Sequence, residues 1–178
     1  TAGIICLPAI SIMIEAAGTL TTDKAVKLFE KFHIFTEVEL ESREEIIYET
    51  YAKSINIEAL TMIDMAGKQI IPAVVRYTKV LADTVNAVKT AGADAATQDE
   101  MLQVVGEKLT AMQTALEKLK KAEKEASAME DAKAQAFFYK DTVRAAMDEL
   151  RAPADELEMI VDKEYWPIPT YGELMFEI

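Results

Sequence analysis

The sequence predicts an all-α fold, a bundle of long, kinked antiparallel helices with an extended C-terminal tail rich in aromatic residues and proline. Proline and glycine, which interrupt helices, number only 5 and 6 among 178 residues. Apolar residues recur at spacings of three and four along most of the chain, as on the buried face of a helix. Hydrophobic residues make up 51% of the chain and charged residues 28%, so one domain with its own core is expected.

Charge and cysteine content narrow the range of partners and environments. The formal net charge is −12, which argues against binding to nucleic acid or to an anionic membrane surface. Cys6 is the single cysteine, so no internal disulfide can form and a reducing, cytoplasmic setting is expected.

Residues 1–20 form an apolar N-terminal segment that we separate from a helical domain over residues 21–178. The segment lacks the basic leader of a signal peptide, and Pro8 and Glu15 interrupt it well before the roughly 20 residues that a membrane helix needs. We expect a buried segment or a remnant of an upstream domain. The chain begins at Thr1 rather than Met, which suggests a piece of a longer protein.

A short helix is predicted within residues 21–35. Thr21, Thr22 and Asp23 are residue types that cap helix N-termini. Near the end of this helix, Glu30 and His33 form a Glu-x-x-His pair, half of the motif that di-iron helical bundles use. Such a site needs the pair twice, and His33 is the only histidine. A helix-terminal histidine is therefore favoured over a small di-metal bundle enzyme.

The longest predicted helix runs from Thr36 to Ala91. Thr36 and Glu39 have the spacing of a capping box. Pro72 has no amide proton and crowds the preceding turn, so a kink rather than an end is expected near it. The apolar stripe of this helix consists of Leu40, Ile47, Tyr51, Ile55, Met62, Ala66 and Ile70.

A group of carboxylates lies near the start of this helix. Glu41, Glu44 and Glu45 could perform acid–base chemistry or hold a hard cation. Arg43 lies among them and the surrounding turn is polar, so a solvated face is favoured.

Residues 56–65 are apolar on nearly every side, as in a helix buried among others. We therefore expect the polar residues of this stretch to hydrogen-bond within the bundle or to a partner domain. These residues are Asn56, Glu58, Thr61 and Asp64.

A second long helix is predicted after a turn at Gly92, with Thr97 and Glu100 as a second capping box. On its outer face, Glu117 and Lys121 have the i,i+4 spacing of an ion pair. A strict heptad seam, typical of helix-on-helix packing, consists of Leu102, Val105, Leu109, Met112, Leu116 and Leu119.

A chain reversal is predicted at residues 127–131, because the seam then finds an antiparallel partner. One uninterrupted helix of about 50 residues, roughly 75 Å long, is the alternative. The next helix is predicted over residues 132–161, and Pro153 either kinks it or begins a new helix.

The C-terminal tail differs from the rest of the chain in composition. Within residues 165–172, two closely spaced prolines disfavour helix and three aromatic rings favour burial. We expect the tail to dock within its own chain in preference to another subunit. Leu174, Phe176 and Ile178 alternate with other residues as in a short edge strand. The residues predicted to dock between domains are Tyr165, Trp166, Pro167, Tyr171 and Phe176.

The motifs of common catalytic sites are absent from the sequence. It has no glycine-rich nucleotide loop, no Cys/His cluster for zinc, and no Ser–His–Asp or Cys–His arrangement with an evident partner for His33. We therefore assign no catalytic, cofactor-binding or metal-ligating residue and predict a helical scaffold.

Five ordered stretches between residues 24 and 178 support a family assignment: Phe35–Arg43, Lys53–Ala66, Gln69–Val75, Leu150–Asp155 and Tyr165–Gly172. Together they resemble the C-terminal region of type III glutamine synthetases. Glu44 departs from the pattern, since an aromatic residue is expected after the Ser-Arg pair.

The resemblance implies a parent enzyme of nitrogen metabolism that joins ammonia to glutamate with ATP and Mg²⁺ or Mn²⁺, in a large two-ring homo-oligomer. The ligands for metal, glutamate and nucleotide in that family lie in an upstream catalytic domain and fall on no position of this chain. The resemblance therefore implies a non-catalytic domain that packs on the catalytic domain of the same chain and supports oligomer assembly. The alternative is a free-standing helical-bundle or coiled-coil interaction module.

Overall fold

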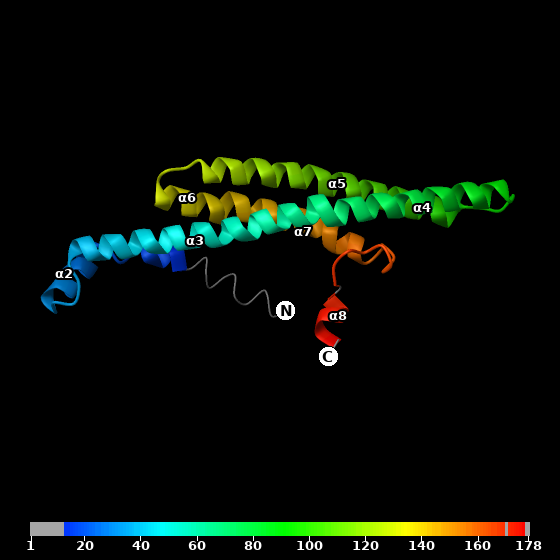
Figure 1. The fold of residues 1–178 in the computed structure, drawn as a ribbon. Coiled ribbons are helices and arrows are strands. Elements are labelled where there is room, and N and C mark those ends of the chain that lie inside the picture. The colour runs from blue at the N-terminus through cyan, green and yellow to red at the C-terminus, as the bar shows by residue number, and fades with distance from the viewer. Residues whose placement is uncertain (1–12, 170, 177–178) are drawn as a thin grey trace. The chain divides into compact units, whose positions relative to one another are not determined.

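The computed structural model describes residues 13–169 and 171–176, and all regular secondary structure in these ranges is helical. Residues 13–17 form one helical segment, and most of the predicted apolar segment, residues 1–12, lies outside the described ranges. The all-α prediction is confirmed for the described residues. The elements that follow, coloured from blue to red in Figure 1, are α2 (Asp23–Lys31), α3 (Glu37–Met65), the π-helix η1 (Ala66–Ile70), α4 (Ile71–Thr90), α5 (Ala96–Ser127), α6 (Ala132–Phe138), the π-helix η2 (Tyr139–Val143), α7 (Arg144–Glu158) and α8 (Tyr171–Phe176).

The chain divides into two compact units, and both α3 and α5 contribute residues to each of them. The first unit contains residues 1–59 and 122–145, and the second contains residues 60–121 and 146–178. None of the described helices is both long and apolar enough to cross a membrane.

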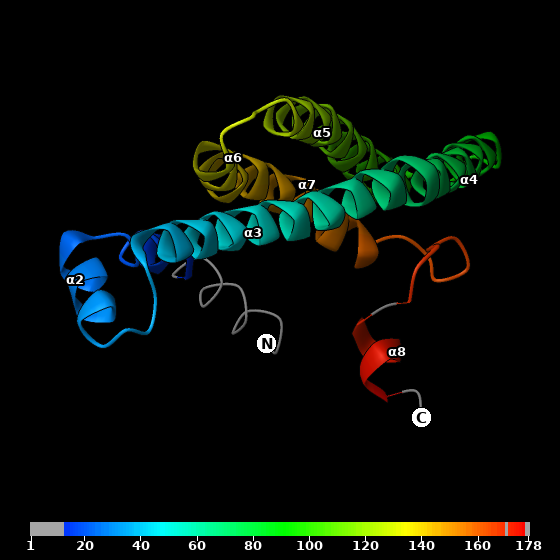
Figure 2. The same ribbon diagram turned by 60° about the vertical axis from the view of Figure 1, so that its left-hand side comes forward.

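In the first unit, α3 and α6 run in the same direction. Lys133 Nζ lies 3.4 Å from Glu44 Oε1, and four residues further along each helix the rings of Phe137 and Tyr48 lie 6.1 Å apart. The end of α5 runs the opposite way, since residues 128–131 reverse the chain between α5 and α6 (Figure 2). Buried side chains of this unit include Ile14, Leu40, Tyr51, Ile55, Ala126, Ala136, Tyr139 and Val143.

In the second unit, consecutive long helices are antiparallel. Lys89 at the end of α4 pairs with Asp99 at the start of α5, at 2.7 Å. Lys118 of α5 pairs with Glu149 of α7 at 2.6 Å, and Lys108 pairs with Glu156, so residue numbers fall along one helix as they rise along the other.

Four of the six heptad-seam residues of α5 are buried within the chain and Leu102 and Leu109 are half-buried, which confirms the prediction of helix-on-helix packing. Val105, Met112 and Leu119 are each 0% exposed, and Leu116 is 2% exposed. Leu116 Cδ2 would lie 3.7 Å from a methyl group placed on Gly67, so the seam packs against the long helix at a glycine.

Pro72 interrupts the long helix without ending it, as the sequence predicts. The turn before Pro72 widens into η1, in which the Ile71 amide donates to the Ala66 carbonyl five residues earlier. A π turn re-spaces the backbone hydrogen bonds and so accommodates a residue that cannot donate one. The second π turn, η2, contains no proline, so nothing of that kind in the sequence predicts it.

The ends of the long helices show two confirmed cap predictions and one wrong one. The Thr36 amide donates to Glu39 Oε2 at 2.8 Å and the Glu39 amide donates to Thr36 Oγ1 at 3.4 Å, the predicted capping box. Gly92 has φ 78° at the predicted C-terminal position. Helix α5, however, begins before Thr97, because the Asp94 carboxylate accepts the Ala96 amide at 3.1 Å and starts the helix earlier.

The reversal at residues 127–131 is confirmed, and the single-helix alternative is wrong. Asp131 caps α6 by accepting the amides of Lys133 and Ala134 at 3.0 and 3.1 Å. A capping aspartate therefore starts α6 after a reversal that no glycine or proline marks.

Pro153 lies buried inside α7, which excludes the alternative that it begins a new helix. Two further predictions in the second half of the chain are wrong. Glu117 pairs with Lys120, at 2.8 Å, rather than with Lys121. Leu174 lies in helix α8 rather than in a strand, because a helix satisfies its own backbone hydrogen bonds whereas a lone strand cannot; Ile178 lies outside the described residues.

Candidate functional site

The aromatic tail places two of its predicted docking residues against the helices of its own unit. The Tyr165 ring lies 5.7 Å from the ring of Tyr77 on α4, and Trp166 is 8% exposed. Burial, together with the charge of Asp162, raises the pKa of the Tyr77 hydroxyl. Pro167 is exposed.

The side chains of Tyr171 and Phe176 lie outside what the structure describes, although their backbone belongs to α8. Docking of the five tail residues between domains therefore stays a prediction. Lys163 and Glu173, which pair at 2.5 Å, connect α8 to the segment that follows α7.

Trp166 has a buried indole N–H for which the described residues supply no acceptor. The ring is packed for its apolar surface, since an unpaired buried donor contributes unfavourably. Near the same tail, Ile168 lines an apolar cavity of about 250 Å³. Its other walls are formed by Met62, Met65, Ala66, Ile70, Met112, Leu150, Arg151, Ala154 and Asp155.

Glu44 corrects the prediction of a fully solvated acidic face. Glu41 and Glu45 are exposed, but Glu44 is buried, at 8% exposure. Its carboxylate accepts hydrogen bonds from the Thr21 hydroxyl at 2.6 Å and the Tyr48 hydroxyl at 2.8 Å. Lys133 Nζ donates a third bond at 3.4 Å.

The donors around Glu44 determine its charge state. Burial raises the pKa of the Glu44 carboxyl, but the hydrogen bonds from Thr21 and Tyr48 and the charge of Lys133 outweigh that effect, and the net pKa lies below the ordinary value. Burial and the Glu44 carboxylate raise the pKa of Tyr48 to about 12. The group is thus a fixed anion that joins α3, α6 and the turn before α2. The i,i+4 spacing of Glu44 and Tyr48 is the one sign of it in the sequence.

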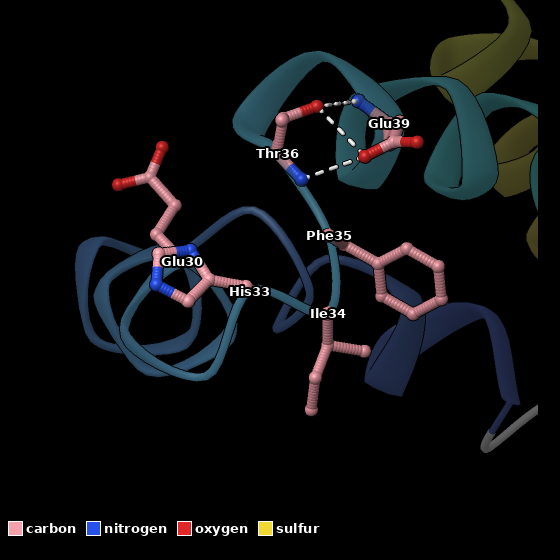
Figure 3. Close-up of a pocket in the computed structure, with 6 residues that line it drawn as sticks. All are labelled: Glu30, His33, Ile34, Phe35, Thr36 and Glu39. Atoms are coloured by element: carbon pink, nitrogen blue, oxygen red, sulfur yellow. Dashed lines mark hydrogen bonds between the residues drawn. The ribbon is translucent and has the colours of Figure 1, made fainter.

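Glu30 and His33 lie at an open hollow of about 420 Å³ between the end of α2 and the start of α3 (Figure 3). Phe35, Thr36 and Glu39 also line it. The Glu39 carboxylate is engaged by Thr36 in the capping box. Within the described ranges, no group of three or more His, Cys, Asp or Glu side chains is placed to hold a metal ion.

His33 serves the end of α2, as favoured from the sequence. Its φ of 53° is in the left-handed region. The His33 amide donates to Glu30 O and the Ile34 amide to Phe29 O, both at 3.0 Å, which is a Schellman motif. A non-glycine residue at this position confers some backbone strain.

The polar residues of 56–65 only partly follow expectation. Asp64 pairs with Lys68, whereas Asn56 Oδ1 is buried and finds no donor among the described residues. Ile57 is 67% exposed, so the described helices do not surround this stretch on every side.

These features define the class of protein: an all-helical domain with packed helix seams, an aromatic tail and exposed apolar side chains. Residues 5–89 match the family described as the glutamine synthetase C-terminal domain. That match begins within the N-terminal segment that sequence analysis leaves without a family assignment.

Known proteins extend the similarity over nearly the whole chain. A glutamine synthetase of Butyrivibrio fibrisolvens is 36% identical over 174 residues, 97% of this chain and 25% of that protein. The type-3 glutamine synthetase of Dictyostelium discoideum is 33% identical over 168 residues, 91% and 23%. A glutamine synthetase of Bacteroides fragilis strain YCH46 is 31% identical over 159 residues, 86% and 22%.

Residues 5–89 therefore belong to the glutamine synthetase C-terminal domain family, and the chain is homologous to type-3 glutamine synthetase. It spans about a quarter of the length of the relatives that it matches.

Proposed function

We propose that this chain is the non-catalytic C-terminal domain of a glutamine synthetase that ligates ammonia to glutamate with ATP. In this proposal the domain packs on the catalytic domain of the same chain and supports assembly of a homo-oligomer. The observation that supports it most directly is the similarity to glutamine synthetases over 97% of this chain but only 25% of the relative. The chemistry then belongs to the part of the protein outside these residues.

The state of the buried carboxylate supports the proposal that the chemistry lies in another domain. Glu44 is the buried carboxylate among the described residues. Its hydrogen bonds from Thr21, Tyr48 and Lys133 leave little capacity for a substrate or a cation. ATP and Mg²⁺ or Mn²⁺ are accordingly proposed to bind in the catalytic domain.

The alternative, a coiled-coil adaptor that pairs through the heptad seam, conflicts with the burial of that seam. Val105, Met112 and Leu119 are 0% exposed within the chain itself, so these seam positions have no free surface for a second molecule. The exposed apolar residues lie elsewhere, for example at Ile57 and Val75.

The test is made on the full-length protein with residues 165–178 deleted. Removing Trp166 and Tyr165 uncovers apolar surface around Tyr77 and removes the proposed docking tail. We expect a lower melting temperature and a smaller assembly in sedimentation velocity, with ATP-dependent glutamine formation reduced in parallel.

The matched control is Trp166→Phe in the full-length protein. Phenylalanine keeps an aromatic ring and removes the indole N–H that has no acceptor, so assembly size and activity should stay as in the wild type. A deletion variant with unchanged assembly size and melting temperature contradicts the proposed role of the tail. A full-length protein that forms no glutamine contradicts the proposed enzyme.

A further inference from the structure

The corner between α2 and α3 exposes a run of large apolar side chains. Leu28 is 54% exposed, Phe32 61%, Ile34 55% and Val38 72%, and we call these four residues the corner patch. Leu28 in α2 and Phe32 at the C-cap of α2 lie one turn apart. Ile34 lies in the connection and Val38 in the first turn of α3, so the four side chains come from eleven consecutive residues.

The backbone beneath the corner patch is held by local interactions. The Schellman motif at His33 ends α2, and the capping box of Thr36 and Glu39 begins α3 only three residues later. Phe35 is fixed from two sides, because its ring lies 5.7 Å from the ring of Phe29 and 4.2 Å from the Arg43 guanidinium. A surface held in this way loses little conformational entropy on binding.

Exposed charged side chains border the corner patch. Glu30, Glu37 and Glu39 are exposed, and Glu30 borders the hollow shown in Figure 3 together with His33. Lys27 and Lys31 are exposed on α2, and Arg43 lies over the Phe35 ring. A partner surface of apolar side chains bordered by charged residues of both signs complements this arrangement.

The length of the relatives indicates which partner covers the corner patch. The relatives are about four times as long, and the matching family is a C-terminal domain, so the remaining polypeptide precedes residue 1. Residues 1–59 belong to the same compact unit as the corner patch. Covalent attachment through that unit gives the preceding polypeptide a high effective concentration at the patch.

We propose that the corner patch docks on the preceding, catalytic part of the same polypeptide, on a surface of apolar side chains bordered by charged residues. The inference rests on the proposed function and specifies which face of the domain makes the contact.

The test uses the full-length protein with the photoreactive residue benzoylphenylalanine in place of Phe32. The matched control carries it in place of Met159, which is 86% exposed and lies in the other compact unit. After irradiation we expect position 32 to yield an intrachain cross-link, with the mobility of one polypeptide on a denaturing gel, to a peptide that precedes residue 1. We expect no such product from position 159.

A second measurement separates docking from accidental proximity. Benzoylphenylalanine in place of Ile34 should give the same product. The added substitution Phe32→Glu should abolish that product, because a hydrated carboxylate cannot replace the apolar contact that the ring makes. The Met159→Glu substitution should leave the product unchanged.

Two results would overturn the inference: a cross-link from position 32 to a second copy of the polypeptide, or no cross-linked product from positions 32 and 34. An intrachain product from position 159 alone would overturn the corner patch but leave the proposed function standing. The proposed function fails separately, if the full-length protein forms no glutamine.

Discussion

The Glu44 carboxylate shows how much a single side chain can depend on its surroundings. Glu45, the next residue, is exposed, whereas Glu44 turns inward and accepts hydrogen bonds from Thr21, Tyr48 and Lys133. Thr21 lies before α2, Tyr48 lies one turn further along α3, and Lys133 lies in α6. Losing the charge leaves Lys133 without its partner and alters the bonds to two hydroxyl groups.

We predict that Glu44→Gln lowers the free energy of unfolding at pH 7 by roughly 1–3 kcal/mol, the usual range for a buried polar group that loses its charge-assisted bonds. Urea unfolding of the 178-residue chain measures this. Glu45→Gln, one residue away and exposed, is the control and should change stability little. Equal effects of the two substitutions would contradict the role given to Glu44.

The same variant should change the dependence of stability on pH. The pKa of Glu44 is lower in the folded chain than the ordinary value of 4.5, so the unfolded chain takes up this proton first as the pH falls. The contribution of Glu44 is therefore present above about pH 4.5 and is lost as the pH falls through the lower folded value. The stability difference between wild type and Glu44→Gln should shrink over that interval, and a difference independent of pH would contradict the assignment.

At the scale of the helix, the ends are decided by single capping groups. The capping box at Thr36 could be identified from spacing because both of its residues are local. The Thr97 box was a similar pattern, yet Asp94 captures the Ala96 amide first.

We predict that Asp131→Ala destabilises the chain by about 1 kcal/mol, since the Lys133 and Ala134 amides lose their acceptor at the start of α6. Asp131→Asn keeps an acceptor at the same atom and should retain most of the stability. Thermal unfolding of the two variants beside the wild type measures the difference. An Asn variant as unstable as the Ala variant would show that charge, not capping, is what Asp131 supplies.

At the scale of the molecule, the seam of α5 belongs to the folding of one chain. Leu116 is 2% exposed and packs over Gly67, so truncating it opens a cavity inside the second unit. We predict that Leu116→Ala lowers the free energy of unfolding by about 2–5 kcal/mol. Because no partner chain is lost, the sedimentation coefficient of the folded 178-residue chain should not change. A variant that stays fully stable but dissociates from dimer to monomer would favour the coiled-coil alternative.

The sequence by itself determined the helical class, the Pro72 interruption, the capping box at Thr36, the reversal before Asp131 and the family. All of these depend on periodicity, on residues close together in the chain, or on long ordered similarity. Only the tertiary structure decided that Glu44 is buried, that η2 forms at Tyr139–Val143, and that Leu28, Phe32, Ile34 and Val38 remain uncovered. Burial depends on which distant helix covers a side chain, and residues as far apart as Glu44 and Lys133 meet only after the chain has folded.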